Sequence, residues 1–136
     1  MNSVFIFITM FLISLQGKPN QLEDFRWKNR ILLVFQNEIA SIDAFSDSLE
    51  IEMRERRLLY FFVSEEFKSN VEVDFSKPYL ESLKREFGMG GNTGSWVLIG
   101  LDGGVKMKRE WKLDWNLIFK TIDSMPMRKS EIKRIN

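Results

Sequence analysis

Residues 95–136 read SWVLIGLDGGVKMKREWKLDWNLIFKTIDSMPMRKSEIKRIN, and this stretch decides the fold class. The apolar run 95–100 ends in glycine, which is typical of a short strand buried on both faces. Asp-Gly-Gly at 102–104 then supplies residues that tolerate a positive φ in a tight turn, and apolar and charged residues alternate at 105–108. The stretch therefore predicts a β-hairpin with a half-exposed return strand.

A helix is predicted directly after the hairpin. Asp114 is a favourable N-cap residue, and Pro126 is expected to end the helix. Between them, apolar residues recur at helical spacing and predict one face that packs on the sheet: Trp115, Ile118, Phe119, Ile122 and Met125.

The first half of the chain predicts a parallel strand pair. The segments 30–35 and 58–63, which are apolar apart from Arg30, have the length and composition of buried strands. The helix between them is marked by an apolar stripe at Ile39, Ile42, Phe45, Leu49 and Met53. A β-α-β unit of this kind implies parallel strands with a right-handed crossover.

A further helix is predicted before the hairpin. The polar and charged segment 64–75 is expected to be a loop. Ser76 is then expected to cap a helix that has Pro78 in its first turn and that ends at Gly88. The inward face of this helix consists of Leu80, Leu83 and Phe87.

Composition and charge agree with a single domain. The chain has 136 residues, of which 44% are hydrophobic, and this is enough to bury one core but not two. Its net charge of +1 implies no obligatory polyanion partner and no specific binding of nucleic acid. The charge is uneven, because residues 102–136 hold nine Lys and Arg against five Asp and Glu. We interpret this excess as a solvated helix face and tail.

The N-terminal segment predicts export. Residues 4–15 are almost continuously apolar, which is short for a membrane span but right for the hydrophobic region of a signal peptide, and Gly17 is a small residue at a suitable cleavage point. We therefore expect a signal peptide at 1–17, a mature domain at 18–136 without a stable membrane span, and a secreted or periplasmic location. An uncleaved anchor and a buried strand are the alternatives for this segment.

Three motifs carry a family resemblance. The segments RWKNRILLVF at 26–35, LIGLDGGVKMK at 98–108 and IDSMPMRKSEI at 122–132 resemble the DUF4174 family. That family includes secreted bacterial single-domain proteins, and related domains occur beside sushi repeats in animal extracellular proteins. The resemblance implies a thioredoxin-like fold and an extracytoplasmic compartment, with no settled activity. Leu101 and Lys108 stand where the family pattern has lysine and arginine.

The predicted element order fits this fold. The chain reads β-α-β, then α, then β-β-α, which is an α/β class with a central mixed sheet flanked by helices, in the order of the thioredoxin core. Thioredoxins keep a reactive cysteine just past the first strand, where the helix dipole lowers its pKa. Residues 36–39 of this chain read Gln-Asn-Glu-Ile, and the whole sequence lacks cysteine. Thiol redox chemistry is therefore excluded.

Metal and hydrolytic chemistry is limited in the same way. Zinc, copper and haem sites normally need His or Cys, and the chain has neither, which also excludes Ser-His-Asp and Cys-His mechanisms. We predict no metal and no cofactor. Calcium is a formal alternative, without the spacing of a binding loop, at Glu65, Glu66, Glu72 and Asp74.

Two tryptophans are candidates for exposed stacking residues. Trp27 and Trp111 each lie beside Arg or Lys, whereas Trp96 and Trp115 fall on predicted inner faces. Packing in the core or at its rim is the simpler explanation for all four.

The remaining candidates for a binding site lie in the three motifs: Arg30, Asp102, Lys106, Asp123 and Arg128. If they converge in space, they form a fixed ion-pair cluster or an anion-binding patch. Alternatively, Asp102 only shapes the turn and Arg128 only neutralises the carbonyl end of the last helix. We therefore predict a non-enzymatic exported module that binds a protein or an anionic extracellular polymer. The alternative is an enzyme with carboxylate and arginine chemistry or an unseen cofactor, which a concave pocket around these residues would favour.

Overall fold

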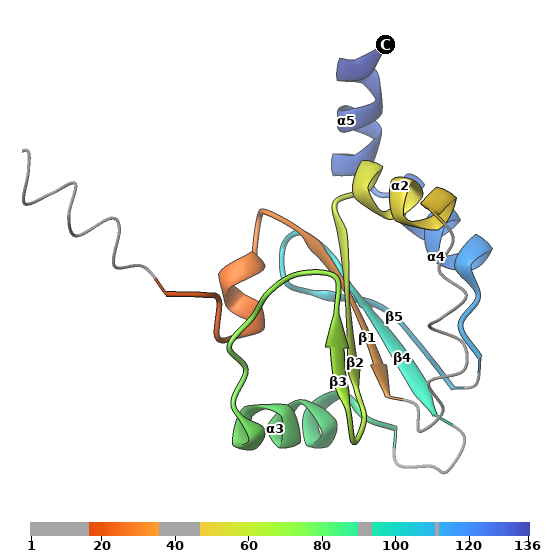
Figure 1. Ribbon diagram of the computed structural model, residues 1–136. Coiled ribbons are helices and arrows are strands. Elements are labelled where there is room, and N and C mark those ends of the chain that lie inside the picture. The colour runs from red at the N-terminus through yellow and green to blue at the C-terminus, as the bar shows by residue number, and fades with distance from the viewer. Residues whose placement is uncertain (1–16, 36–46, 90–93, 111) are drawn as a thin grey trace, which may run out of the picture.

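The elements of the fold are taken from a computed structural model, which describes residues 17–35, 47–89, 94–110 and 112–136 (Figure 1). Along the chain they are η1 (Leu22–Phe25), β1 (Arg30–Phe35), α2 (Asp47–Glu55), β2 (Leu58–Val63), β3 (Phe67–Ser69), α3 (Lys77–Phe87), β4 (Ser95–Ile99), β5 (Val105–Glu110), α4 (Trp115–Asp123) and α5 (Pro126–Ile135).

β1 lies at the centre of a five-stranded mixed sheet with the order β3-β2-β1-β4-β5. It runs parallel to β2, with Ile31 opposite Leu59, and antiparallel to β4, with Ile31 opposite Ile99. β3 and β5 form the edges as antiparallel neighbours of β2 and β4. The predicted α/β, thioredoxin-like fold is confirmed, including the bounds of the first two strands and the hairpin.

Both faces of the sheet are covered by helical elements. Successive side chains of a strand point to opposite faces, so each strand contributes to two cores. Leu32 and Val34 of β1 belong to one core, which is completed by side chains of α2 and α4. Ile31 and Leu33 belong to a second core, which packs against η1 and α3. Figure 1 shows the two pairs of helical elements on opposite sides of the sheet.

The helix caps follow the sequence prediction. The Ser76 hydroxyl accepts a hydrogen bond from the Tyr79 amide at 3.2 Å, and the Asp114 carboxylate accepts one from the Leu117 amide at 3.0 Å. Gly88 ends α3. The predicted apolar faces pack inward through Leu49, Met53, Leu80, Leu83, Phe87, Trp115, Ile118, Phe119, Ile122 and Met125. The remaining stripe residues Ile39, Ile42 and Phe45 lie outside the described residues.

The prediction of a loop over 64–75 is wrong, because Phe67–Ser69 form the edge strand β3. The rings of Phe67 and Phe75 lie 6.1 and 5.2 Å from the ring of Phe61 in the second core. Charged residues surround Phe67 and Phe75 in the sequence, so composition alone does not reveal that these two rings pack in the core.

The prediction that Pro126 ends the preceding helix is also wrong. α4 ends at Asp123, and Pro126 is the first residue of α5. The first amide of a helix has no partner within the helix, so a proline costs little there. The alternation at 105–108 also does not place Val105 in the core: its side chain is exposed, and the register between β4 and β5 shifts beside it.

The expected signal peptide falls on residues 1–17, of which only Gly17 is described. Within the described part of the chain, none of the helices has the length and apolar character needed to cross a membrane. The domain boundary at residue 18 stays a prediction.

Candidate functional site

Three of the five predicted site residues meet at the end of the sheet where β1 begins. Arg30 opens β1, Asp123 closes α4 and Arg128 lies in the first turn of α5. Arg30 and Arg128 are buried, with only 1% and 6% of their surface exposed. We call this group, together with Glu52, Arg56 and Glu131, which connect its members, the arginine network.

Arg30 and Glu131 form the inner part of the arginine network. The two terminal nitrogens of Arg30 donate to the two carboxylate oxygens of Glu131, each at 3.3 Å. Nη1 of Arg30 also donates to the backbone carbonyl of Arg56 at 2.8 Å. Arg128 lies 3.6 Å from the same Glu131 carboxylate and donates to the carbonyl of Glu55 at 2.9 Å. These bonds fasten α5 to β1 and to the end of α2.

Asp123 and Arg56 form the outer part of the arginine network. Arg56 donates to both oxygens of Asp123 at 3.0 and 2.9 Å, and Nε of Arg128 donates to Asp123 at 3.2 Å. Arg56 also pairs with Glu52, and its guanidinium lies 4.6 Å from the centre of the Phe119 ring. The planar guanidinium suits such paired and stacked contacts.

The pKa values of the outer pair favour their charged forms. Burial raises the pKa of Asp123, but hydrogen bonds and positive charge from Arg56 and Arg128 outweigh it, so the pKa lies below its ordinary value. Burial lowers the pKa of Arg56, but the bonds to Asp123 and Glu52 outweigh it, so that pKa is raised. Asp123 is therefore a poor proton acceptor near neutral pH, and each carboxylate of the arginine network is already paired.

The other two predicted residues form a separate pair in the hairpin. Lys106 donates to one oxygen of Asp102 at 2.9 Å, and the other oxygen accepts from the Gly104 amide at 2.9 Å. The hydrogen bond from Lys106, and then the one from Gly104, lower the pKa of Asp102. No hydrogen bond or ion pair joins these described residues to the arginine network. The predicted five-residue site is thus two local structures.

Sequence reasoning missed an open hollow next to the arginine network. It has a volume of about 500 Å³, and its charged lining is Lys28, Glu50, Arg54 and Arg57, with Asn29 and Asn70 beside them. None of the three cations has an ion-pair partner among the described residues. We call this feature the basic hollow. The signal for it was the run Arg-Glu-Arg-Arg at 54–57, where basic residues favour the carbonyl end of α2.

The backbone of Arg57 fixes one wall of the basic hollow. Its φ of 50° is left-handed, a conformation that few residues other than glycine adopt. Its amide donates to the Arg54 carbonyl at 3.0 Å, and its own carbonyl accepts from the Arg30 amide at 2.8 Å. The turn that ends α2 therefore separates Arg56, which joins the arginine network, from Arg57, which lines the basic hollow.

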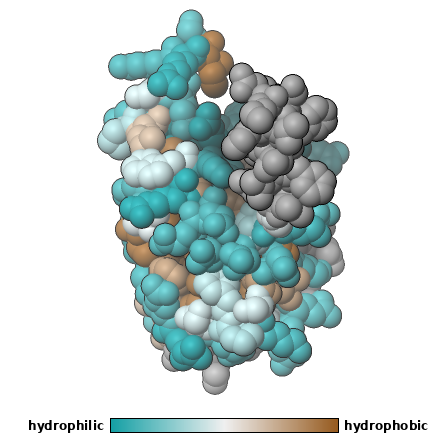
Figure 2. Space-filling view, turned by 90° about the vertical axis from the view of Figure 1, so that its left-hand side faces the viewer, coloured by the Kyte–Doolittle hydropathy of each residue, from teal (hydrophilic) through white to brown (hydrophobic). Residues whose placement is uncertain are grey.

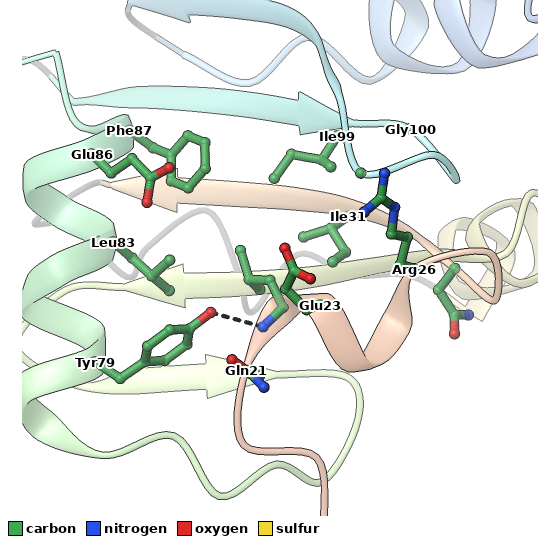
Figure 3. Close-up of a pocket in the computed structure, with 13 residues that line it drawn as sticks. Gln21, Glu23, Arg26, Ile31, Tyr79, Leu83, Glu86, Phe87, Ile99 and Gly100 are labelled. Carbon is green, nitrogen blue, oxygen red and sulfur yellow. Dashed lines mark hydrogen bonds between the residues drawn. The ribbon is translucent and has the colours of Figure 1, made fainter.

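A second hollow lies between η1 and α3, over β1 and β4 (Figure 3). It has a volume of about 300 Å³ and is lined by apolar residues of the sheet and α3 and by charged residues of η1 and α3. One bond joins its two walls, since the Leu22 amide donates to the Tyr79 hydroxyl at 2.8 Å. We call this feature the η1–α3 groove.

Trp27 is one of the two tryptophans singled out as exposed, and 58% of its surface is accessible. Its φ of 67° is left-handed, and its amide donates to the Leu101 carbonyl at 2.7 Å. The guanidinium of Arg26 lies 5.9 Å from its ring centre. The hydrogen bond between Trp27 and Leu101 brings the first two sequence motifs together. Trp111, the other candidate, is not among the described residues.

Four acidic residues of the described ranges are possible calcium ligands in the sequence. Within 17–35, 47–89, 94–110 and 112–136, no three acidic side chains gather closely enough to hold a metal ion. The four acidic residues weighed for calcium, which all lie in these ranges, therefore form no such cluster.

The comparisons with known proteins give one match. None of the curated proteins and none of the solved structures matches the chain. The model of one family, described as a domain of unknown function, matches residues 21–131. This range covers most of the chain and contains the arginine network, the basic hollow and the η1–α3 groove. The chain therefore belongs to the DUF4174 family.

Proposed function

We propose that this chain is an exported, non-enzymatic domain that binds an anionic polymer at the basic hollow. The observation that carries the proposal is that Lys28, Arg54 and Arg57 surround one hollow without an ion-pair partner in the part of the chain that the structure describes, whereas the nearby Arg30 and Arg56 each pair with a carboxylate. Cations gathered in one hollow attract an anion more strongly than scattered ones, because their potentials add.

Helix α5 extends the positive surface at this end of the molecule. Arg128 fastens its first turn to the carbonyl of Glu55, next to the turn that lines the basic hollow. Lys129, Lys133 and Arg134 are exposed on α5, and Figure 1 shows the helix projecting beyond the sheet at the end where α2 leads into β2. A long polyanion can therefore reach both the hollow and the helix.

The character of the face shown in Figure 2 supports a polymer over a protein partner. Figure 2 shows hydrophilic side chains over most of the face on view, with apolar residues only in small, scattered spots. Stable protein interfaces usually have a contiguous apolar centre. A hydrophilic face with local positive charge is better suited to a flexible, charged chain.

The enzyme hypothesis receives less support from the same geometry. Neither the basic hollow nor the η1–α3 groove is lined by any of the five residues proposed from the sequence. The acidic ones among them are occupied by arginine or lysine partners. An enzyme would be expected to present such groups, with shifted pKa values, inside a pocket.

The binding experiment uses dextran sulfate, a polyanion without bases or proteinaceous groups, and the chain from Lys18 onward. The double variant Arg54→Gln and Arg57→Asn removes two charges, and asparagine tolerates the left-handed φ of residue 57. We expect its affinity to fall roughly fivefold to tenfold at low salt, since each exposed charge contact contributes up to about 1 kcal/mol.

The matched control for this experiment is the double variant Lys77→Gln and Arg85→Gln, which removes two exposed charges of α3 outside the basic hollow. We expect it to bind nearly as tightly as the wild type. Equal losses in the two double variants would mean that net charge alone determines binding, and the proposal would be wrong.

Export is tested separately from binding. Mass spectrometry of the protein recovered from outside the cytoplasm is expected to show a mature chain that begins near Lys18. Recovery of the intact N-terminus from the soluble cytoplasmic fraction would contradict export. It would not affect the test of polyanion binding.

A further inference from the structure

We propose that the η1–α3 groove binds a small zwitterionic ligand of amino-acid or dipeptide size, with its ammonium group between Glu23 and Glu86 and its carboxylate at Arg26. This site is distinct from the basic hollow, with which it shares only Asn29 as a lining residue. The proposal does not depend on polymer binding.

The floor of the groove is apolar and is fixed by the fold. Ile31 of β1 and Ile99 of β4 lie opposite each other in the sheet, and Leu83 of α3 lies beside them. All three are at least 95% buried, so they form a rigid base. Phe87 closes one end of the floor. An aliphatic side chain of a ligand therefore finds an apolar surface here, as small-molecule sites usually provide.

The rim of the groove carries charges that do not pair with each other. Figure 3 shows Glu86 on α3 and Glu23 on η1 on opposite sides of the groove, with Arg26 near Gly100 at the far end. None of these three charged residues has an ion-pair partner among the described residues. Two carboxylates that flank a hollow suit a cation, and a guanidinium suits a carboxylate.

The potential at the acidic side is negative. The pKa of the Tyr79 hydroxyl is raised, mainly by burial, although the hydrogen bond from the Leu22 amide lowers it. The negative charges of Glu86, Asp24 and Glu23 raise this pKa further. Glu86 also lies in the last turn of α3, where the carbonyl end of the helix dipole adds negative potential. Asp24 itself is engaged in bonds to the amides of Asn20 and Gln21, which leaves Glu23 and Glu86 for a ligand.

The glycine turn keeps the Arg26 end in place. A Cβ atom at Gly103 would lie 3.4 Å from Nε of Arg26, so the arginine side chain packs directly on the turn backbone. The neighbouring residue Trp27 is held by its bond to Leu101. The hairpin thus supports the Arg26 side chain, and Arg26 is an exposed residue that lines the groove.

The size of the groove limits the ligand. A volume of about 300 Å³ lies at the lower end of the range for ligand sites, roughly 300–1,000 Å³. One or two residues of a peptide fit, but a folded partner does not. The probe is therefore the dipeptide leucyl-leucine with free termini, compared with its N-acetyl and C-amide forms, which each lack one charge.

The experiment follows backbone amide shifts by NMR during titration of the chain from Lys18 onward. We expect leucyl-leucine to shift the amides of Leu22, Gly100 and Gly103, which line the groove. Each capped form is expected to bind about fivefold more weakly or worse. Arg26→Gln is expected to weaken the free dipeptide but not the C-amide, and Glu86→Gln to weaken the free dipeptide but not the N-acetyl form.

The control variant is Glu81→Gln, which removes an exposed carboxylate of the same helix that pairs with Lys84 and does not line the groove. It is expected to bind leucyl-leucine like the wild type, and Glu86→Gln to bind dextran sulfate like the wild type. Absence of shifts in the groove amides, equal affinity for free and capped dipeptides, or equal losses in Glu81→Gln and Glu86→Gln would each overturn the proposal.

Discussion

Arg30 and Glu131 are 101 residues apart in sequence and are joined by two hydrogen bonds of 3.3 Å. Arg30 is the first residue of the central strand and Glu131 lies in the last helix. The pair therefore links an early element of the fold to its last element. The buried guanidinium also explains how α5 is held at the end of the sheet although its surface is mostly polar. α5 is attached by charge-assisted hydrogen bonds more than by apolar packing.

The first prediction follows from the burial of that pair. Glu131→Ala leaves the Arg30 guanidinium, only 1% exposed, without its counter-charge. We expect the free energy of unfolding in urea to fall by about 3 kcal/mol, because removal of one partner leaves an uncompensated buried charge. Lys133→Gln, an exposed change in the same helix, is the control and is expected to change it by less than about 0.5 kcal/mol. Equal effects of the two variants would mean that α5 is not fastened through Glu131.

The second prediction concerns pH and the outer pair of the arginine network. The pKa of Asp123 in the folded state lies below its ordinary value of 3.8, since the bonds from Arg56 and Arg128 outweigh the effect of burial. A carboxyl with a lowered folded-state pKa contributes stability that is present above the unfolded-state pKa and is lost as the pH falls through the folded-state pKa.

Urea denaturation of the wild type and Asp123→Asn at a series of pH values tests this expectation. The stability difference between them is expected to stay constant above about pH 5 and to shrink below about pH 4. The control Glu81→Gln, which changes an exposed carboxylate outside the arginine network, is expected to show a much smaller difference throughout. A difference between wild type and Asp123→Asn that grows as the pH falls would contradict the assignment.

Local signals in the sequence were sufficient for most of the fold. The strands at 30–35 and 58–63 have the predicted bounds, because polar or charged residues mark both ends of the short apolar run in each strand. Ser76 and Asp114 cap their helices as predicted, because a cap depends on residues only three positions apart. β3 was missed because it has only three residues and is stabilised by pairing with β2, a tertiary effect.

The site could be predicted only in part, for a related reason. Arg30, Asp123 and Arg128 were selected because they lie in the family motifs, yet their partners Arg56 and Glu131 are set by chain folding over 67 and 101 residues. Asp102 and Lys106 bind each other within one hairpin, so membership of a motif did not mean membership of one site. The left-handed backbones of Trp27 and Arg57 also have no signal in a sequence, since neither residue favours that conformation.

The third prediction concerns the hairpin turn. Gly103 has a φ of +81°, which confirms that at least one glycine of the turn is left-handed. Gly103→Val adds a β-branched side chain at this φ and places its Cβ atom against Arg26, so we expect a loss of about 2 kcal/mol in unfolding free energy. Lys106→Ala, which removes only a half-exposed ion pair with Asp102, is expected to cost less than about 1 kcal/mol. The reverse order of the two losses would show that the turn is not constrained as described.

The last prediction concerns the bond that joins the two walls of the η1–α3 groove. Tyr79→Phe keeps the ring, which packs against Phe75 with centroids 5.2 Å apart, but removes the hydroxyl that accepts from the Leu22 amide at 2.8 Å. An amide that loses its partner in a half-buried position is expected to cost about 1 kcal/mol of stability. The Leu22 amide is also expected to exchange with deuterium faster, because η1 is then free to open without the rest of the fold. The Ile118 amide of α4, on the other side of the sheet and bonded to the Asp114 carbonyl at 3.0 Å, serves as the internal control and is expected to keep its protection. Faster exchange at both amides would indicate global destabilisation, and unchanged exchange at Leu22 would show that the Tyr79 hydroxyl does not hold η1 against α3.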